Sequence, residues 1–358
     1  MTSSSFCEVG MDICEIDKNF AIETNLKEKD IVYHHILQEP ISLYGVRYEN
    51  EHFARMSPAV ADTVNPGVAR LCQNTAGGRI RFVTDSPYIA IKVKYHSLYR
   101  ADHFPLCGTA GFDLYYDKGD GFDYFATFRP PYDIKDGYES IHYPNKGKCA
   151  YQINMPLYST VAMVWIGIKE GSVLEKAEGY PNEKPVVFLG SSITQGGCAS
   201  RPGNAYTEML SRRLNFDYVN LGFSGSCRAE DAMIDYIASL DMSVFVYDYD
   251  HNAPTPEHLI ETHERGFLRI REKHPDLPII MLTAPKWDIS PYYASRRDII
   301  RANYERAVAR GDQNVYFIDG ETLFSICHKE GTVDDTHPND FGFYSMAQAI
   351  APILEKLL

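Results

Sequence analysis

Two short runs of this 358-residue chain carry its most reactive combination of side chains. The first, "VVFLGSSITQGG", is an apolar run that stops at a glycine and places Ser191 and Ser192 directly after it. The second, "VDDTHPND", holds Asp334 and His337 three residues apart, so that one turn can present both side chains. A serine hydroxyl becomes a strong nucleophile when a histidine takes its proton, and a carboxylate orients that histidine. The residue types therefore indicate nucleophilic catalysis, with His337 as base and Asp334 as its partner.

Two further segments between these runs carry hydrogen-bond donors. "NLGFSGS" contains Gly225, and "DYDHNAP" contains Asn252. Attack on an ester produces a tetrahedral oxyanion, which backbone and side-chain N–H groups stabilise. The N–H of Ser192, the N–H of Gly225 and the side-chain amide of Asn252 are the expected donors. The alternatives are that Gly225 only supplies a turn with positive φ and that Asn252 only caps the turn before Pro254.

The elements that must position these residues alternate from residue 186 onward. Strand-like apolar runs are separated by amphipathic helical patterns, one of which opens with Thr255-Pro256, a favourable N-cap followed by proline at N1. The expected strands are Val186–Leu189, Tyr218–Leu221, Val244–Tyr249, Ile279–Thr283 and Val315–Ile318. This alternation predicts an α/β domain with a flavodoxin-like, parallel five-stranded sheet and helices on both faces. Three of the polar segments directly follow a strand and the fourth precedes the last helix, so we expect all four at the carboxyl edge of the sheet.

The first half of the chain has a different pattern, with short strands separated by turns. "RIRFVTDSPYIAIKVKY" contains two strand-like runs split by Asp85-Ser86-Pro87, and "GFDLYYDKGDGFDYFATF" has the pattern of a hairpin with its loop at residues 118–121. Short strands at such intervals are typical of an all-β sandwich of the jelly-roll kind. We therefore expect four parts, which are an N-terminal extension at 1–40, a β-sandwich domain at 41–170, a charged linker at 171–184 and a catalytic domain at 185–358.

The composition disfavours several classes of protein. The net charge is −13 at pH 7, which argues against nucleic-acid binding, and no run approaches the roughly 20 apolar residues of a membrane span. The N-terminus lacks the basic and apolar regions of a signal peptide, so a cytoplasmic location is expected unless the chain has been trimmed. The eight cysteines are scattered without a C-x-x-C pair, which favours free thiols. No cofactor, nucleic-acid partner or membrane partner is expected, and the oligomeric state stays open.

The chain resembles the SGNH hydrolases, also called GDSL esterases, over roughly residues 186–358. Their first block, G-D-S-x-[ST]-x-G, is matched by residues 190–196, and their last, D-x-x-H-P, by residues 334–338. "NLGFSG" and "YDHNA" stand where the two intermediate blocks are expected. The four blocks occur in the order of the family.

The resemblance implies a role for each polar residue singled out above. Ser192 stands at the third position of the first block and would be the nucleophile. His337 and Asp334 would be its catalytic partners, and Gly225 and Asn252 would be oxyanion donors. The family pattern needs no metal.

The chain departs from the family pattern in two places and matches a subgroup in a third. Ser191 replaces the aspartate of the first block, and Asp250 and Ala253 flank Asn252 where the family has glycine and aspartate. Neither departure removes a proposed catalytic group, although both would reshape the substrate pocket. The first half contains "GFDLY" at residues 111–115, which resembles the G-x-D-L-Y motif of a two-domain subgroup. Members of that subgroup look like carbohydrate-type esterases or acyl transferases.

These features predict a serine esterase that forms an acyl-enzyme and hydrolyses small acyl esters. Its expected partner is a small-molecule or carbohydrate ester, with acetyl on a sugar as the first expectation. The nearest alternative is an acyltransferase that uses the same three residues. An alternative of another class is a non-catalytic glycan-binding protein in which the β-domain binds the sugar.

Two catalytic positions have a neighbouring rival. Ser191 rivals Ser192 as the nucleophile, because the doublet blurs the register, and is expected to support the turn. Asp335 rivals Asp334 as the partner of His337, and the spacing favours Asp334.

The remaining candidates belong to the substrate pocket. Ser191, His251 and Trp287 are expected near the substrate, although His251 also fits a structural role in its loop. Trp287 would either stack on a sugar or pack against the protein. Asp248 and Asp250 beside His251 form a weak metal-binding pattern, and the expectation is that no metal is bound.

Overall fold

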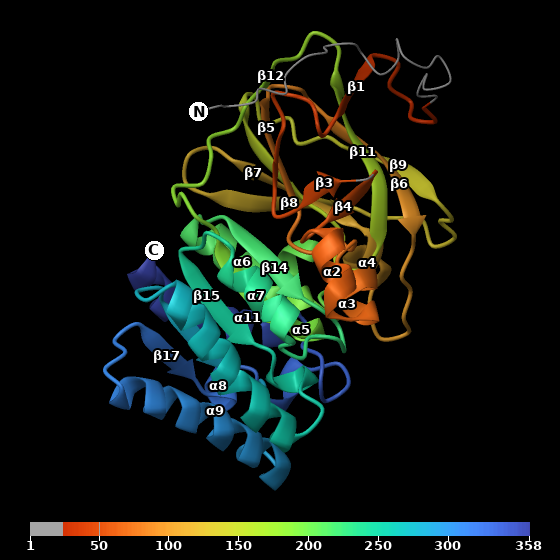
Figure 1. Cartoon of the computed structure of the whole chain (residues 1–358). Helices are drawn as coiled ribbons and strands as arrows, with labels where there is room; N and C mark the ends of the chain where they lie inside the picture. The colour runs from red at the N-terminus through yellow and green to blue at the C-terminus, as the bar shows by residue number, and fades with distance from the viewer. Residues whose placement is uncertain (1–23, 50) are drawn as a thin grey trace.

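Five parallel strands form the central sheet of the C-terminal domain in the computed structural model, which describes residues 24–49 and 51–358 (Figure 1). The strands are β13 (Val186–Gly190), β14 (Tyr218–Gly222), β15 (Val244–Asp248), β16 (Ile279–Leu282) and β17 (Val315–Ile318). Their order across the sheet is β14-β13-β15-β16-β17, which confirms the predicted flavodoxin-like sheet. In this order the winding reverses at β13, so the carboxyl end of β13 lies where such folds bind their ligands.

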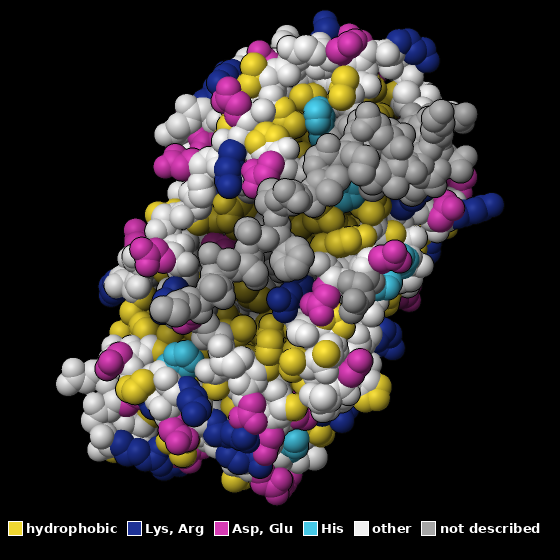
Figure 2. Space-filling model, turned by 45° about the horizontal axis from the view of Figure 1, so that its top comes forward, with side chains coloured by type: hydrophobic (Ala, Val, Ile, Leu, Met, Phe, Trp, Pro, Cys, Tyr) yellow, Lys and Arg dark blue, Asp and Glu magenta, His cyan; other side chains and the backbone are white. Residues whose placement is uncertain are grey.

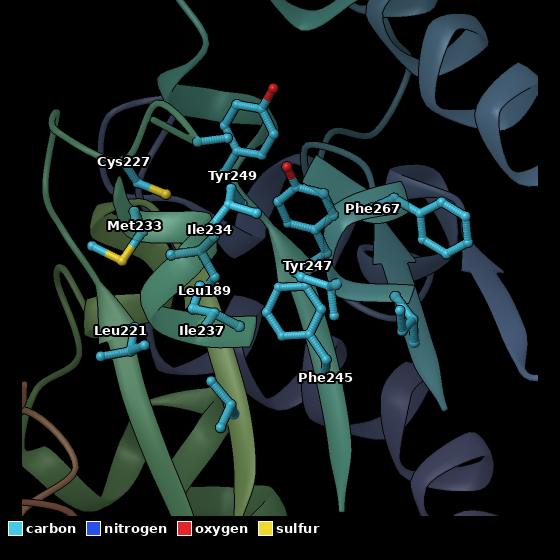
Figure 3. Close-up of a cluster of buried hydrophobic side chains, with 14 of the residues drawn as sticks. Leu189, Leu221, Cys227, Met233, Ile234, Ile237, Phe245, Tyr247, Tyr249 and Phe267 are labelled. Carbon is cyan, nitrogen blue, oxygen red and sulfur yellow. The ribbon is translucent and has the colours of Figure 1, made fainter. Parts of the chain in front are cut away.

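Helices pack on both faces of this sheet. One face is covered by α6 (Tyr206–Leu214) and α11 (Asp340–Leu357), and the other by α7 (Asp231–Ala238), α8 (Pro256–Lys273) and α9 (Pro291–Ala309). Alternate residues of β13 face opposite sides, with Val186 and Phe188 in the first core and Val187 and Leu189 in the second. Figure 3 shows the second core, where strand side chains meet those of α7 and α8. No helix within the described ranges is long and apolar enough to cross a membrane.

The outer surface of α7 and α8 carries its charges in pairs. Arg265 lies 2.9 Å from Asp231, and Arg269 lies 2.7 Å from Asp235. These pairs are exposed to solvent, where each contributes only about 0–1 kcal/mol. Figure 2 shows basic and acidic side chains interspersed over the lower part of the face in view. Although the net charge of the chain is −13, the surface of α7 and α8 thus carries both acidic and basic side chains.

In the part of the chain that the structure describes, the N-terminal domain has two large antiparallel sheets around one core and a separate antiparallel pair of short strands, β3 (Arg47–Glu49) and β4 (His52–Ala54). The first sheet contains, in order, β1 (Ile31–His35), β11 (Thr160–Lys169), β6 (Ile89–Ser97) and β9 (Gly137–His142). The second contains β12 (Leu174–Glu175), β5 (Arg79–Thr84), β10 (Cys149–Asn154), β7 (Phe112–Asp117) and β8 (Phe122–Phe128), with β2 (Ser42–Tyr44) paired to β5. Ile80 and Phe82 of β5 share their core with Ile91 and Val93 of β6. The β-rich N-terminal domain and the hairpin at β7 and β8 are thus confirmed, while the jelly-roll connectivity stays a prediction.

Two features of this domain differ from the sequence-based expectation, and the turn at residues 85–87 adds a strand arrangement that the expectation left open. β1 lies within the expected N-terminal extension and pairs with β11, and β12 lies within the expected linker and pairs with β5. The turn at residues 85–87 joins β5 and β6, which belong to different sheets. Both strands direct apolar side chains into the core between the sheets. Two helices, α2 (Pro58–Val64) and α3 (Pro66–Leu71), interrupt the strands and bury Ala61 and Val68 in the core of the α/β domain.

Two buried arginines of the N-terminal domain bind the edge of β14. Arg79 donates to the carbonyl of Tyr218 at 2.7 Å, and Arg55 donates to the carbonyls of Asn220 and Gly222 at 3.0 and 2.5 Å. These carbonyls belong to alternate residues of an edge strand, whose outward backbone groups need partners when they are buried. The arginines supply those partners and fix the N-terminal domain to the strand that leads toward Gly222.

The G-x-D-L-Y motif joins the two domains through Asp113. This fully buried carboxylate accepts hydrogen bonds from Nη1 of Arg201 at 2.7 Å and from the N–H of Gly203 at 2.8 Å. The hydroxyl of Tyr115, from the same motif, also contacts Arg201. Arg201 and Gly203 lie on the loop that leads from the carboxyl edge of β13 to α6, so the motif anchors that loop to the N-terminal domain.

Asp113→Ala should lower the free energy of unfolding by about 3 kcal/mol, because it leaves the Arg201 guanidinium and the Gly203 N–H without their acceptor. Urea unfolding followed by circular dichroism measures this change. Asp120→Ala, in the exposed loop of the same hairpin, is the control and should shift stability by less than about 0.5 kcal/mol. Equal stability of the two variants would mean that other contacts hold the loop.

Candidate active site

Ser192 begins a short helix directly after the first strand of the sheet. This helix, α5 (Ser192–Gln195), starts two residues beyond Gly190. A Cβ on Gly190 would lie 1.9 Å from the hydroxyl oxygen of Thr194, so glycine allows the helix to fold back closely on the strand end. Ser191 is the N-cap, and its side-chain oxygen accepts a hydrogen bond from a backbone N–H of α5 at 3.1 Å. The doublet therefore has two roles, with Ser191 capping the helix and the hydroxyl of Ser192 directed elsewhere.

His337 lies between Ser192 and Asp334. Its Nε2 is 3.0 Å from Oγ of Ser192, and its Nδ1 is 2.8 Å from Oδ2 of Asp334. Because an ionised carboxylate only accepts hydrogen bonds, Nδ1 carries the proton and Nε2 accepts from the serine hydroxyl. The other oxygen of Asp334 accepts from the backbone N–H of His337 at 2.7 Å. Partial burial opposes ionisation of Asp334, but the hydrogen bonds from His337 outweigh it and lower the pKa to about 2.

Asp335 has a different partner from its neighbour. Its carboxylate lies 3.6 Å from Nζ of Lys286, and the same ammonium donates to the Asp335 carbonyl. The φ of Asp335 is +63°, a left-handed turn that sends the two adjacent carboxylates in different directions. The geometry thus pairs Asp334 with His337 and Asp335 with Lys286.

Gly225 and Asn252 lie on the loops that follow β14 and β15. Gly225 has a φ of +66°, and a Cβ there would meet no atom within 4 Å, so the need for glycine is conformational. The side-chain amide of Asn252 donates to the carbonyl of Phe223 at 2.8 Å, which uses one of its two N–H groups. The N–H of Ser224 donates to the side chain of Gln195 in α5 at 3.0 Å. These bonds connect both loops to the helix that carries the serine.

Two buried carboxylates lie at the end of β15. Asp248 accepts hydrogen bonds from the hydroxyls of Thr194 and Tyr206 at 2.8 and 3.1 Å, and burial raises its pKa to about 7. Asp250 forms a buried ion pair with Arg296 at 2.8 Å. Each carboxylate that the sequence offered as a metal ligand therefore has protein partners. Through Thr194, Asp248 also holds α5 in place.

The raised pKa of Asp248 predicts that its contribution to stability falls as the pH rises from about 4 to about 7. The unfolded carboxyl has a pKa near 3.9, so the folded protein binds more protons within this interval and is favoured at its lower end. Asp248→Asn should flatten this part of the profile, measured as the urea midpoint of both proteins at several pH values. A variant profile parallel to that of the wild type would contradict this assignment.

His251 lies close enough to Lys286 to feel its charge, and Trp287 follows Lys286 in the chain. The ring of His251 packs against Tyr293 at 5.9 Å, and burial, reinforced by the charge of Lys286, lowers its pKa to about 3. Its buried Nε2 has no hydrogen-bond partner in the described part of the chain. Trp287 stacks on His328 at 4.0 Å and is 36% exposed. Within the described residues, neither side chain shares a hydrogen bond with the serine, the histidine or the aspartate.

The N-terminal domain reaches this site with residues that the sequence analysis did not single out. The hydroxyl of Tyr158 donates to the carbonyl of Ser192 at 3.2 Å. The side-chain oxygen of Asn74 accepts from the side-chain amide of Gln195, the last residue of α5, at 3.1 Å. The ring of His103 lies 5.5 Å from that of His337. All three residues are in loops far along the chain from their partners, where no periodic pattern marks them.

Comparison with known proteins gives a consistent result for both halves of the chain. Residues 183–355 match the GDSL-like lipase/acylhydrolase family, and residues 31–174 match the family described as the N-terminus of SGNH hydrolase-type esterases. Among solved structures, a protein described as a GDSL-like lipase from Bacteroides ovatus is 30% identical, with a TM-score of 0.83. The match covers 91% of this chain and 98% of that one.

More distant structures share the two-domain fold. A salicylyl-acyltransferase from a tetracycline biosynthetic pathway is 19% identical with a TM-score of 0.75, over 92% of this chain and 98% of that one. A family two carbohydrate esterase from Cellvibrio japonicus is 12% identical with a TM-score of 0.62, over 91% and 98%. No curated protein sequence gives a significant match. From the matches to both halves and the 30% identity over nearly the whole chain, we conclude that this protein belongs to the GDSL-like lipase/acylhydrolase family of esterases.

Proposed function

We propose that this protein is a serine esterase that removes small acyl groups, first of all acetyl, from a carbohydrate. The observation that carries the proposal is the hydrogen-bonded chain from Ser192 through both ring nitrogens of His337 to Asp334. A protein that only binds glycans has no use for such a chain, which makes the non-catalytic alternative the weaker one.

In the first step, Oγ of Ser192 attacks the ester carbonyl carbon and its proton passes to Nε2 of His337, 3.0 Å away. The ionised carboxylate of Asp334 stabilises the imidazolium that forms. The N–H groups of Ser192 and Gly225 and the second amide N–H of Asn252 are the proposed donors to the oxyanion, and one such donor is worth about 3 kcal/mol. The intermediate then expels the alcohol, whose oxygen takes the proton from Nε2.

The second step repeats this chemistry with water. Nε2 of His337 takes a proton from the water as its oxygen attacks the acyl carbon. The bond to Oγ of Ser192 breaks, the proton returns to that oxygen, and the free acid leaves. No other group is needed to balance the reaction.

Two observations support a small acyl group on a sugar. Ser192 is only 8% exposed, and the hydroxyl of Tyr158 of the N-terminal domain donates to its carbonyl. The indole of Trp287 already stacks on His328, but it stays partly exposed beside the Lys286 that holds the Asp335 loop, so its exposed part is available for contact with a sugar. A protein with the same fold is described as a family two carbohydrate esterase, which supports the choice of a carbohydrate ester.

A series of p-nitrophenyl esters with acyl groups of increasing length tests whether the enzyme prefers a small acyl group. kcat/KM should be highest for acetate and lower by at least about tenfold for octanoate, because a crowded site excludes a longer chain. Acetate release from peracetylated xylose and acetylated xylo-oligosaccharides then tests the carbohydrate. If the protein hydrolysed none of these esters, the proposal would be overturned.

The same assay separates hydrolysis from acyl transfer. An acyltransferase passes the acyl-enzyme to an alcohol, and a salicylyl-acyltransferase has the same fold. With a methyl glycoside added as acceptor, a hydrolase still releases free acetate, whereas a transferase forms the acylated glycoside in its place. Glycan binding without turnover of any ester would favour the binding protein instead.

A further inference from the structure

Three side chains beside the proposed nucleophile form a cluster of metal-ligating type. His103 comes from the loop between β6 and α4 (Leu106–Ala110), Cys198 follows α5, and His337 precedes α11. One ligand atom from each lies within 4.8 Å of the others, and this is the one such group in the residues that the structure describes. Two imidazoles and a thiol are the ligand types that zinc prefers.

The second observation concerns the outer partners of the two histidines. Nδ1 of His103 lies 3.1 Å from the carboxylate of Asp102, and Nδ1 of His337 lies 2.8 Å from that of Asp334. Zinc-binding histidines almost always have such a partner on the nitrogen that does not bind the metal. Both rings therefore have Nε2 as their available ligand atom, and their centroids are 5.5 Å apart.

Cys198 is held in an unusual position. Its φ is +78°, a left-handed conformation that a residue with a Cβ adopts only at a cost, and its side chain is almost fully buried. The thiol forms no disulfide. Backbone strain of this kind is typical of positions where a side chain must be presented to a site.

We propose that His103, Cys198 and His337 form a site that binds Zn²⁺ reversibly and inhibits the enzyme. The metal would be held by one nitrogen of each histidine and by the sulfur, with water in the fourth position. The thiol proton is released to solvent as the sulfur binds, and no oxidation or reduction takes place. Ligand atoms of tetrahedral zinc stand about 3.4–3.8 Å apart, so the cluster contracts by about 1 Å when the metal binds.

Inhibition follows from competition for one atom. Nε2 of His337 cannot accept the proton of Ser192 while it binds a metal. This consequence rests on the proposed function, but the metal site itself does not. Because His103 belongs to the N-terminal domain and the other two ligands to the C-terminal domain, the metal would also link the domains.

Cobalt spectroscopy tests the site without using activity. Co²⁺ added to the metal-free wild-type protein should give one equivalent of a thiolate-to-cobalt charge-transfer band and the visible bands of tetrahedral cobalt, and Zn²⁺ should displace them. Cys198→Ser should abolish the charge-transfer band, and His103→Gln should weaken binding at least about tenfold. Cys107→Ser removes a half-buried thiol outside the cluster and is the matched control. A Cys7→Ser/Cys14→Ser variant, at positions outside the described residues, should also keep the band.

Ester hydrolysis at increasing Zn²⁺ gives the second readout. The half-inhibiting concentration should rise at least about tenfold in Cys198→Ser and in His103→Gln, and stay unchanged in Cys107→Ser. A charge-transfer band that persists in Cys198→Ser would overturn the proposal, as would equal inhibition of all variants. A protein without esterase activity that still gives the cobalt band would refute the proposed function and keep the metal site.

Discussion

Ser192→Ala should lower kcat for p-nitrophenyl acetate by about 10⁶-fold, to the level that binding and the oxyanion donors alone supply. The physical reason is that the hydroxyl of Ser192 is the one that faces Nε2 of His337, at 3.0 Å. A hydroxyl without an adjacent base is a weak nucleophile, so no neighbouring hydroxyl can replace that of Ser192 in the attack on the ester. Steady-state hydrolysis and labelling with a fluorophosphonate both measure this loss.

Ser191→Ala is the matched control, one residue away. The side-chain oxygen of Ser191 accepts a backbone N–H of α5, so the variant loses an N-cap worth about 1 kcal/mol. Its kcat should stay within about tenfold of the wild type, while its unfolding midpoint falls. Loss of labelling in Ser191→Ala with retention in Ser192→Ala would exchange the two roles and refute the assignment.

Asp334→Asn should lower kcat by about 10⁴-fold at neutral pH. The amide is uncharged and cannot stabilise the imidazolium, and its NH₂ group favours the wrong tautomer of His337. The pKa of Asp334 lies near 2, so the wild-type carboxylate is ionised throughout the working pH range and its own titration leaves no step in the activity profile there. Measurement of kcat against pH for both proteins tests both statements.

Asp335→Asn separates this effect from a general loss of negative charge on the loop. The Asp335 carboxylate is exposed and lies 3.6 Å from Lys286, so the change should alter kcat by less than about tenfold. Equal losses in the two variants would mean that the loop's total charge, and not the bond between Asp334 and His337, supports the reaction.

The α/β half of the chain could be predicted closely from the sequence. Its strands are short, mostly apolar runs between amphipathic helices, and each predicted strand agrees with β13 to β17 within one residue at either end. Parallel strands joined by helices must bring their carboxyl ends to one edge, so the polar segments after them meet without any further information. Local pattern and chain topology together were sufficient for this domain.

The β-domain could be predicted less completely. Period-two patterns mark where strands lie, but not which strand pairs with which, because pairing depends on contacts between distant segments. For this reason the sequence did not reveal that the two runs around residues 85–87 belong to separate sheets. It also did not reveal that β1 and β12 extend those sheets beyond the expected limits. Two helices were also missed, α3 and α2, of which α2 packs against α7. Each begins with a cap residue followed by proline, Asn65-Pro66 and Ser57-Pro58, but helices of six and seven residues are too short for a clear helical period.

The sequence by itself predicted the candidate reactive residues, their order and the sheet edge at which they meet, because short motifs mark the residues and the alternation of strands and helices sets the edge. Only the tertiary structure decided between neighbours, pairing Ser192 and Asp334 with His337 while Ser191 caps a helix and Asp335 contacts Lys286. It alone also brought His103 and Tyr158 to the site. The direction in which each of two adjacent side chains points depends on the packing of the whole chain. The contacts between loops of the two domains depend on the same packing, and neither feature produces a periodic pattern in the sequence.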